Sequence, residues 1–221
     1  MTETRDTDLH APSTAWLRVF AVLYDPFLWL GEVLGMRRRR RELVAGAYGR
    51  VVEIGAGTGL NAAFYPSGAV DELILTEPEP GMRQKLERRL ARVGRAALVF
   101  DAPAERLPLA DASVDTVVST LVLCTVADPA PALHEIARVL RPGGQLLFIE
   151  HVRADAGWLA WLQDRLLVPW RGFAGGCMCN RPTVELLRAN GFAVHADADR
   201  WRGMPAVVLP LAVGRAIPER C

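Results

Sequence analysis

Lysine is almost absent from this chain, because Lys85 is the only lysine among its 26 basic residues. The other basic residues are arginines, and 25 acidic residues balance them to a net charge of +1. We interpret the excess of arginine as compositional bias of the source genome. The arginine excess therefore says little about partners, and we predict a small-molecule partner and no nucleic acid.

Cysteines are also few. Cys124, Cys177, Cys179 and Cys221 are scattered except for one C-x-C, so neither a disulfide framework nor the C-x-x-C spacing of zinc sites is present. A metal or arsenic site formed by the first three is an alternative, but small, poorly spaced cysteines are usually just packed in the interior. We therefore predict no metal site and a reducing, cytoplasmic environment.

The chain lacks an uncharged apolar stretch of the ~18 residues that a membrane span needs. Its first segment, Met1 to His10, carries acidic residues before any apolar run, the reverse of a secretory signal. We expect a soluble protein without a transmembrane segment. A length of 221 residues with 51% apolar residues allows one domain with a substantial core and a small appendage.

Alternating glycines follow an apolar run in the first half of the chain. Val51 to Ile54 is typical of a buried strand, and Gly55, Gly57 and Gly59 then predict a tight loop that opens a helix. Leu60 stands where the dinucleotide fingerprint G-x-G-x-x-G has its last glycine, and the lysine of a P-loop is missing, so both of those nucleotide sites are disfavoured. A glycine-rich turn without a ligand is the alternative.

The segment V-V-E-I-G-A-G-T-G closely resembles the E/D-x-G-x-G-x-G loop of class I methyltransferases that depend on S-adenosylmethionine (SAM). The resemblance implies that this loop lies against the methionine part of SAM, with Glu53 near its ammonium group. Glu77 ends the next predicted strand, some twenty residues after the glycines, where a carboxylate can accept both ribose hydroxyls. A helix-capping carboxylate would be compatible with the same role.

Later segments fit the same family. The loop from Asp101 to Leu109 resembles its adenine-binding stretch G-D-A-E-x-L-P-F, but Pro103 replaces the usual aspartate, so either Asp101 or only the backbone near Ala104 reaches the adenine amine. The phrases A-D-A-S-V-D-T-V-V and R-V-L-R-P-G-G are also typical. We predict a Rossmann-like α/β fold, with a seven-stranded, mostly parallel sheet and helices on both faces. Strands are expected at 51–54, 72–76, 97–100, 113–118, 145–150, 192–194 and 205–213, and helices at 61–65, 82–93, 128–139, 158–169 and 180–190.

An apolar stripe precedes the first strand, formed by Trp16, Phe20, Leu23, Phe27, Leu30 and Leu34 at helical spacing. Asp25 before Pro26 predicts a new helix start, so two helices should meet at Tyr24 and Asp25. Residues 1–47 are interpreted as a lid on a SAM-binding domain at 48–221. Plain core packing is one alternative. An interfacial membrane helix with peripheral membrane contact is another, although the run Arg37 to Arg41 is more simply a solvated collar.

A narrower resemblance rests on short phrases: Tyr24-Asp25-Pro26, Thr120 to Cys124, Glu150-His151, and Gly176-Cys177 followed by Arg181. They resemble the methyltransferase-like thiol methyltransferases and their bacterial relatives, which carry a methyltransferase type 11 domain. The resemblance implies methyl transfer from SAM to a small apolar acceptor, with a thiol as the first choice. The alternatives are N-, O- or C-methylation of a lipid, quinone or natural product, a SAM-binding protein without turnover, and a dinucleotide oxidoreductase.

Methyl transfer is an in-line displacement that requires alignment and exclusion of water more than catalytic side chains. His151 is the candidate base, because it follows the fifth strand at the sheet edge where the acceptor should lie. A structural histidine that donates to a loop carbonyl is the alternative. Tyr24 and Asp25 could line the acceptor side. The predicted cofactor contacts are Glu53, Gly55, Ala56, Gly57, Gly59, Asn61, Glu77, Pro78, Met82, Ala104, Glu105, Thr120, Leu121 and Cys124.

Overall fold

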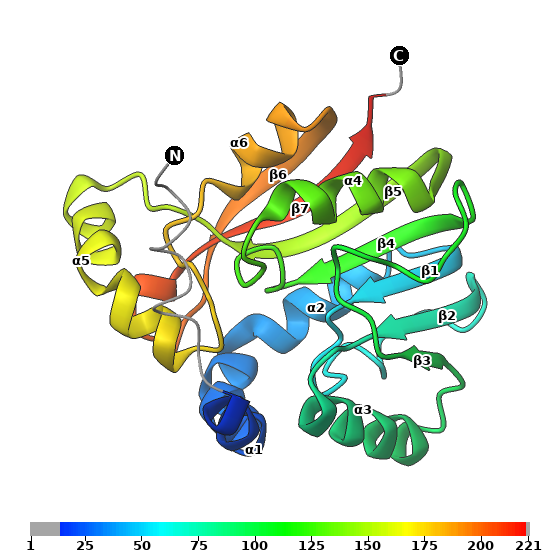
Figure 1. Cartoon of the computed structure of the whole chain (residues 1–221), viewed down its shortest axis with the longest axis horizontal. Helices are drawn as coiled ribbons and strands as arrows, with labels where there is room; N and C mark the ends of the chain where they lie inside the picture. Colours follow the sequence, from blue (N-terminus) through cyan, green and yellow to red (C-terminus); the bar gives the residue numbers. More distant parts are fainter. Residues whose placement is uncertain (1–13, 220–221) are drawn as a thin grey trace, which may run out of the picture.

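The computed structural model describes residues 14–219, and they form a seven-stranded sheet covered by helices on both faces (Figure 1). The strand order is β3-β2-β1-β4-β5-β7-β6, in which β1 to β5 are parallel and β7 runs antiparallel to both β5 and β6. This confirms the predicted fold class. The strands are β1 (Gly49–Ile54), β2 (Val70–Thr76), β3 (Leu98–Phe100), β4 (Val114–Thr120), β5 (Leu140–His151), β6 (Phe192–Arg200) and β7 (Pro210–Pro218).

The centre of the sheet is apolar on both faces. β1 and β4 pair in parallel, with Val52 opposite Val117, and both side chains are fully buried. Such runs of β-branched residues suit strands that have helices above and below them. Because β1 and β4 lie side by side in mid-sheet, their carboxyl ends open the crevice in which α/β proteins bind ligands.

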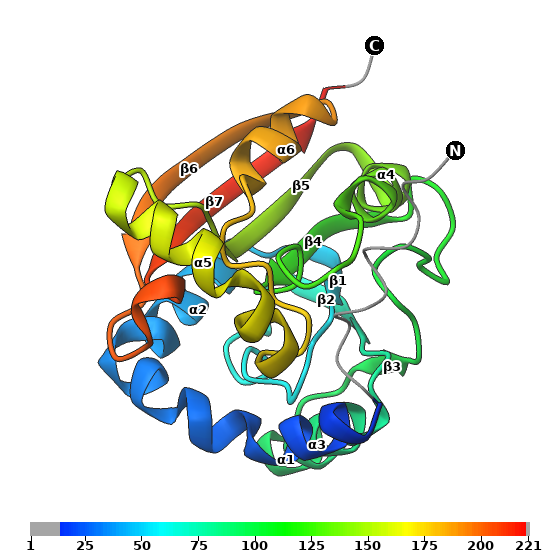
Figure 2. The ribbon, with the colours of Figure 1, turned by 60° about the vertical axis from the view of Figure 1, so that its left-hand side comes forward.

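Each face of the sheet has its own apolar core, beneath the helices that Figures 1 and 2 show. On one face lie α2 (Arg37–Val44) and α3 (Pro80–Val93), which contribute Leu43, Leu86 and Leu90. On the other lie α4 (Pro129–Val139) and α6 (Thr183–Ala189). A third cluster joins α5 (Gly157–Phe173) to the 3₁₀ helix η3 (Ala206–Val208). Pro205 to Leu209 therefore precede β7, so the predicted start of the last strand at Pro205 was wrong.

The N-terminal helix differs from the prediction. α1 (Thr14–Gly31) continues through Asp25 and Pro26, so no helix starts there. Proline has no N–H for the carbonyl of Val22 four residues earlier, but the Lys85 ammonium donates to that carbonyl at 3.0 Å and replaces the lost bond. The break comes instead at Gly35, whose φ of 141° interrupts the π-helical segment η2 (Glu32–Met36) ahead of α2. The helical region before the first strand is predicted to begin near residue 12, and residues 12 and 13 lie outside the described range.

The short helix predicted at 61–65 is also absent, since this segment consists of turns. The side chains of Asn61 and Tyr65 both bond inward to Glu53, and Pro66 ends the segment. Similarly, α6 starts at Thr183 rather than Asn180. At its other end Gly191 has a φ of 78°, as expected for a glycine that terminates a helix.

Candidate active site

The glycine loop between β1 and the following turns has the left-handed backbone that its sequence predicts. Gly55, Gly57 and Gly59 have φ values of 53°, 56° and 80°. A Cβ at Gly55 would lie 2.8 Å from Val122, and one at Gly59 would lie 2.6 Å from Leu86, so packing also requires these glycines. A Cβ at Gly57 would meet no atom within 4 Å. Gly57 therefore presents bare backbone to an open space, as a ligand cradle requires.

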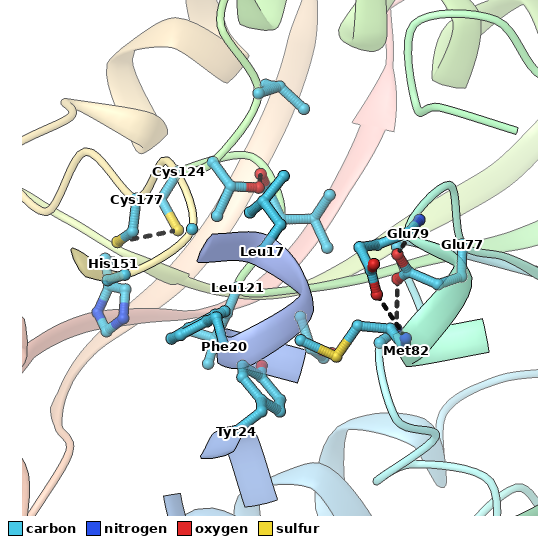
Figure 3. Close-up of a pocket in the computed structure, with 18 of the residues that line it drawn as sticks. Leu17, Phe20, Tyr24, Glu77, Glu79, Met82, Leu121, Cys124, His151 and Cys177 are labelled. Carbon is cyan, nitrogen blue, oxygen red and sulfur yellow. Dashed lines mark hydrogen bonds between the residues drawn. The ribbon is translucent and has the colours of Figure 1, made fainter. Parts of the chain in front are cut away.

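That space is a cavity of about 440 Å³ at the carboxyl edge of the sheet (Figure 3). Its walls come from the glycine loop, the ends of β2, β4 and β5, the inner face of α1, the end of α5 and the segment 201–208. Most predicted site residues line it, namely Tyr24, Gly55, Gly57, Glu77, Pro78, Met82, Ala104, Glu105, Thr120, Leu121, Cys124 and His151. Asp25, Glu53, Ala56, Gly59 and Asn61 are not part of its walls. Their predicted roles, like those of the lining residues, stay predictions.

Glu77 holds the glycine loop against the start of α3. One carboxylate oxygen accepts a hydrogen bond from the N–H of Gly57 at 2.8 Å, and the other accepts one from the N–H of Glu79 at 2.8 Å. Burial raises the pKa of Glu77, and these two backbone donors counteract the rise. Each oxygen keeps a further lone pair, so the carboxylate can still accept hydrogen bonds from a ligand in the cavity.

Glu53 supports the loop from behind. Its oxygens accept hydrogen bonds from the Asn61 amide at 2.8 Å and the Tyr65 hydroxyl at 2.7 Å. Burial raises the pKa of Glu53 to about 7, although both hydrogen bonds oppose the shift. The side chain is 2% exposed, so it acts on the cavity through the loop and through its charge.

Arg40 corrects the prediction of a solvated arginine collar. Its neighbours Arg37, Arg38 and Arg41 are exposed as expected, but Arg40 is buried. Its guanidinium donates to Glu32 at 2.9 Å, and to Asn61 and Thr120 on the sheet side at 3.2 and 3.1 Å. A buried cation is stable only when it is paired and hydrogen-bonded in this way. Arg40 thus joins α2 to the end of β4.

Asp25 and Tyr24, adjacent on α1, have different surroundings. Asp25 accepts hydrogen bonds from Thr58 of the glycine loop and from Arg89 of α3, both at 2.6 Å, which fixes α1 over the loop. Tyr24 faces the cavity. Burial raises the pKa of its phenol well above the ordinary value, and the charge of Arg40 opposes this. The Tyr24 hydroxyl therefore stays protonated and can donate a hydrogen bond, but it is not a base.

His151 lies in the cavity wall and stacks on Trp201, with ring centroids 5.5 Å apart. Burial lowers the pKa of the imidazole to about 4, and interactions with the backbone of Pro210 and Val208 act in the opposite direction. At neutral pH the ring is therefore uncharged and can accept a proton. Its Nδ1 atom is buried and has no hydrogen-bond partner among the described residues. The unpartnered Nδ1 suits a proton acceptor, the low pKa makes the ring a weak base, and the backbone contacts suit a structural histidine, so the role stays a prediction.

Two of the cysteines meet in the cavity wall. The sulfurs of Cys124 and Cys177 are 3.7 Å apart, whereas Cys179 is fully buried in the same apolar cluster and does not line the cavity. The hydrogen bond to Cys177 and burial raise the pKa of the Cys124 thiol. Within residues 14–219 no group of three or more His, Cys, Asp or Glu side chains could hold a metal ion. Cys221 lies outside the described range.

Glu150 organises the loop after β4 that carries Leu121 and Cys124. Its buried carboxylate accepts hydrogen bonds from Ser119 at 2.7 Å and from the N–H groups of Val122, Leu123 and Cys124 at 3.0 to 3.2 Å. This support explains how Leu121 keeps a φ of 63°, which is rare for a non-glycine residue. Arg181 donates to carbonyls on the other side of the loop. Glu150 and Arg181, which belong to two of the short sequence motifs noted above, thus both stabilise the loop after β4.

The sequence analysis did not predict several residues that line the cavity. Trp170 at the end of α5, and Trp201 and Met204 before η3, line it together with Phe20 of α1. No local sequence pattern predicts that these residues line the cavity, because they lie far from the glycine loop in the sequence. Only the spacing of Phe20 in the predicted lid stripe was a signal.

A model of the methyltransferase domain family matches residues 52–148. Human thiol S-methyltransferase TMT1B is 38% identical over 172 residues, which cover 72% of this chain and 69% of that protein. Phosphatidylethanolamine N-methyltransferase of Cereibacter sphaeroides is 33% identical over 132 residues, covering 59% of this chain and 64% of its own.

Among solved structures, a SAM-dependent methyltransferase of Thermotoga maritima, described as a possible histamine N-methyltransferase, superposes with a TM-score of 0.66. It is 22% identical and the match covers 93% of this chain and 99% of that one, which shows a shared fold. The glycine loop around Gly57, the Glu77 carboxylate after β2 and the sequence relatives all indicate the same family. This chain therefore belongs to the family of SAM-dependent methyltransferases that includes the thiol S-methyltransferases.

Proposed function

We propose that this enzyme transfers the methyl group of SAM to the sulfur of a small apolar thiol. The observation that carries the proposal is the division of the cavity. Glu77, Glu79 and Met82 lie together on one side of it, and His151, Cys124 and Cys177 lie on the other (Figure 3). One end is thus polar and adjoins the glycine loop, whereas the other is apolar and contains a neutral imidazole.

The polar end fits the cofactor. Gly57 offers backbone without a side chain, and the buried Glu77 carboxylate has free lone pairs for hydroxyl donors. When bound, SAM supplies a methyl group activated by its sulfonium. The chain itself has to orient the two partners and exclude water, which the apolar rings of Phe20, Tyr24 and Trp170 do at the other end.

The state of His151 favours a thiol over a hydroxyl acceptor. A base whose pKa is about 4 is too weak to deprotonate an alcohol efficiently. A thiol, with an ordinary pKa of ~8.5, is partly ionised unaided and needs only a nearby acceptor for its proton. The relation to TMT1B supports the same choice. N-methylation of a lipid amine is the second candidate, favoured by the relation to phosphatidylethanolamine N-methyltransferase.

Labelled SAM tests the proposal against a panel of small apolar thiols, amines, phenols and quinols. We expect label in the thiols. His151→Asn should lower kcat for a thiol about tenfold or more near pH 7, with a smaller effect as the pH approaches the pKa of the thiol. His134→Asn, which alters an exposed histidine on α4, is the matched control. Transfer to amines or phenols without transfer to any thiol would contradict the proposal.

A further inference from the structure

The outward face of α1 and η2 is apolar. Val19, Val22, Leu23, Trp29, Leu30, Val33 and Leu34 are each between 46% and 64% exposed. Their spacing of three and four residues places them on one side of the helix, together with the exposed Pro26. We call these eight residues the outer stripe. A helix on the surface of a globular protein normally turns charged and polar residues to water, so this stripe is the reverse of the usual pattern.

The inner face of the same helix is already occupied. Tyr24, Phe27 and Leu28 face the cavity, and Ala21 and Met36 are buried. The helix is therefore hydrophobic on both sides, and the part of the chain that the structure describes covers only one of them. Folding of the domain accounts for the inner residues but gives no reason for an exposed tryptophan and six exposed aliphatic side chains on the outer side.

Positive charge flanks the outer stripe. Arg18 lies near its start, and Arg37, Arg38 and Arg41 follow its end, all with exposed side chains. Among the described residues, Arg18, Arg37 and Arg41 have no ion pair, whereas Arg38 pairs with Glu42 at 3.6 Å. Arg37 and Arg41 lie over the ring of Phe64. Apolar side chains next to guanidinium groups without an acidic partner match the acyl chains and the anionic headgroups of a membrane.

The acidic residues of this region do not cancel that charge. Asp25 is paired with Arg89, and Glu32 is paired with the buried Arg40. Within the described residues of α1, η2 and α2, Glu42 is the only exposed acidic residue, and it pairs with Arg38. The surface around the outer stripe is therefore apolar with a basic border. This charge is complementary to phospholipids such as phosphatidylglycerol, and a second copy of the chain would offer the same basic border.

We propose that α1 and η2 lie flat in the interface of an anionic phospholipid bilayer, with the outer stripe in the acyl boundary and the arginines at the phosphates. By length and composition, the helical region Ala15–Val44 could also cross a membrane, and 22% of its most apolar window is buried. Crossing would require α1 to leave Thr58, Lys85 and Arg89, and to abandon the cavity that it lines. The flat orientation keeps all these contacts.

The location of the helix gives the membrane contact a role. The side chains of α1 that line the cavity are separated from the outer stripe only by the thickness of one helix, and Phe173 of α5 contacts Phe20 and Phe27 beside them. An apolar acceptor concentrated in the bilayer would reach the cavity without crossing water. This consequence rests on the proposed function, whereas the membrane contact itself does not.

Vesicle binding of the full chain, measured without SAM or acceptor, tests the proposal. We expect the protein to sediment with vesicles of phosphatidylcholine and phosphatidylglycerol, more weakly with phosphatidylcholine alone, and more weakly at higher salt. The triple variant Trp29→Ser, Leu30→Ser, Val33→Ser should lose about tenfold or more in partition, because less apolar area enters the bilayer. Leu98→Ser, which alters an exposed apolar residue of β3, should bind like the original chain.

The charge is tested separately. Arg37→Gln with Arg41→Gln should weaken binding to the anionic vesicles, and Arg92→Gln, at an exposed arginine of α3, should not. Circular dichroism shows whether each variant is folded. Absence of vesicle binding, or equal binding by the triple variant, would overturn the proposal. So would resistance to alkaline carbonate extraction, which indicates a crossing helix, or a dimer in solution that the triple variant abolishes. If the original chain binds vesicles but methylates no thiol, the proposed function is wrong and the membrane proposal still stands.

Discussion

At the scale of single residues, the carboxylate of Glu77 connects the fold to the cavity. It accepts the N–H groups of Gly57 and Glu79, so the loop and the start of α3 are held by the side chain that a ligand would also meet. Its position follows from the topology, because β1 and β2 are parallel neighbours and their carboxyl ends share one edge. A substitution of Glu77 is therefore expected to affect both ligand binding and the conformation of the loop.

Replacement of this residue removes both its hydrogen bonds to the loop and its contact with a ligand. We predict that Glu77→Ala lowers SAM affinity by roughly 2 to 4 kcal/mol through the loss of charge-assisted hydrogen bonds, while the sheet stays folded. Calorimetric titration with SAM measures the change, and a thermal melt checks the fold. Glu72→Ala, on the same strand but paired with Arg50 outside the cavity, is the control and should bind SAM normally. Unchanged affinity in Glu77→Ala would remove this carboxylate from the site.

At the scale of elements, α1 combines the properties of a lid and of a fixed helix. It lines the cavity on its inner side. Outside its apolar contacts it is held to the domain by a few polar bonds, from Thr58 and Arg89 to Asp25, from Lys85 to the carbonyls of Ala21 and Val22, and from its own Trp16 to the carbonyl of Phe173. Two of these donors lie on α3 and one on the glycine loop. Binding at the loop is thus connected to the position of α1.

Hydrogen exchange distinguishes a lid from a core helix. If α1 closes over the cofactor, the amides of 16–31 should exchange quickly in the free protein and slow down when S-adenosylhomocysteine binds. The amides of α4, which packs on the opposite face, are the internal control and should be protected in both states. Strong protection of α1 in the free protein, unchanged by the ligand, would identify it as core.

At the scale of the molecule, the parallel sheet and the glycine loop could be predicted because their signals are local. Runs such as Val51 to Ile54 fix a buried strand, and glycines at alternate positions fix the loop. The continuity of α1 could not be predicted, because Lys85, which replaces the hydrogen bond lost at Pro26, is remote in the sequence. Arg40 was misassigned for the same reason, since its partners Asn61 and Thr120 belong to other elements.

The end of the cavity that contains His151 also depends on residues that are remote in the sequence and could not be predicted from it. His151 could be placed at the sheet edge because it directly follows a strand. Its neighbour Trp201 comes from a segment fifty residues later, and nothing near Trp201 in the sequence indicates a cavity. The state of His151 depends on this packing, because burial sets the pKa of the ring. The chemistry of the acceptor end is thus a property of the assembled molecule.

Buried ionisable groups make the stability of the molecule depend on pH, and His151 and Glu53 contribute to this dependence with opposite signs, whereas Glu77 and Glu150, whose pKa values burial also raises, act in the same direction as Glu53. The pKa of His151 is lowered to about 4. Between pH ~6.5 and ~4 the unfolded chain therefore binds a proton at this residue and the folded chain does not, so the free energy of unfolding decreases as the pH falls through this range. The pKa of Glu53 is raised to about 7, so its contribution is present at low pH and is lost as the pH rises through 7. The two slopes have opposite signs.

We predict that between pH 5 and 6.5 His151→Asn changes the slope of unfolding free energy against pH by up to about 1.4 kcal/mol per unit, toward greater stability in acid, because one proton is no longer taken up on unfolding. Glu53→Gln should tilt the curve the other way by a similar amount. Urea denaturation at a series of pH values measures both, and His134→Asn, at an exposed histidine of α4, is the matched control. Curves for His151→Asn and Glu53→Gln that also run parallel to the original would show that neither group titrates differently in the folded and unfolded states.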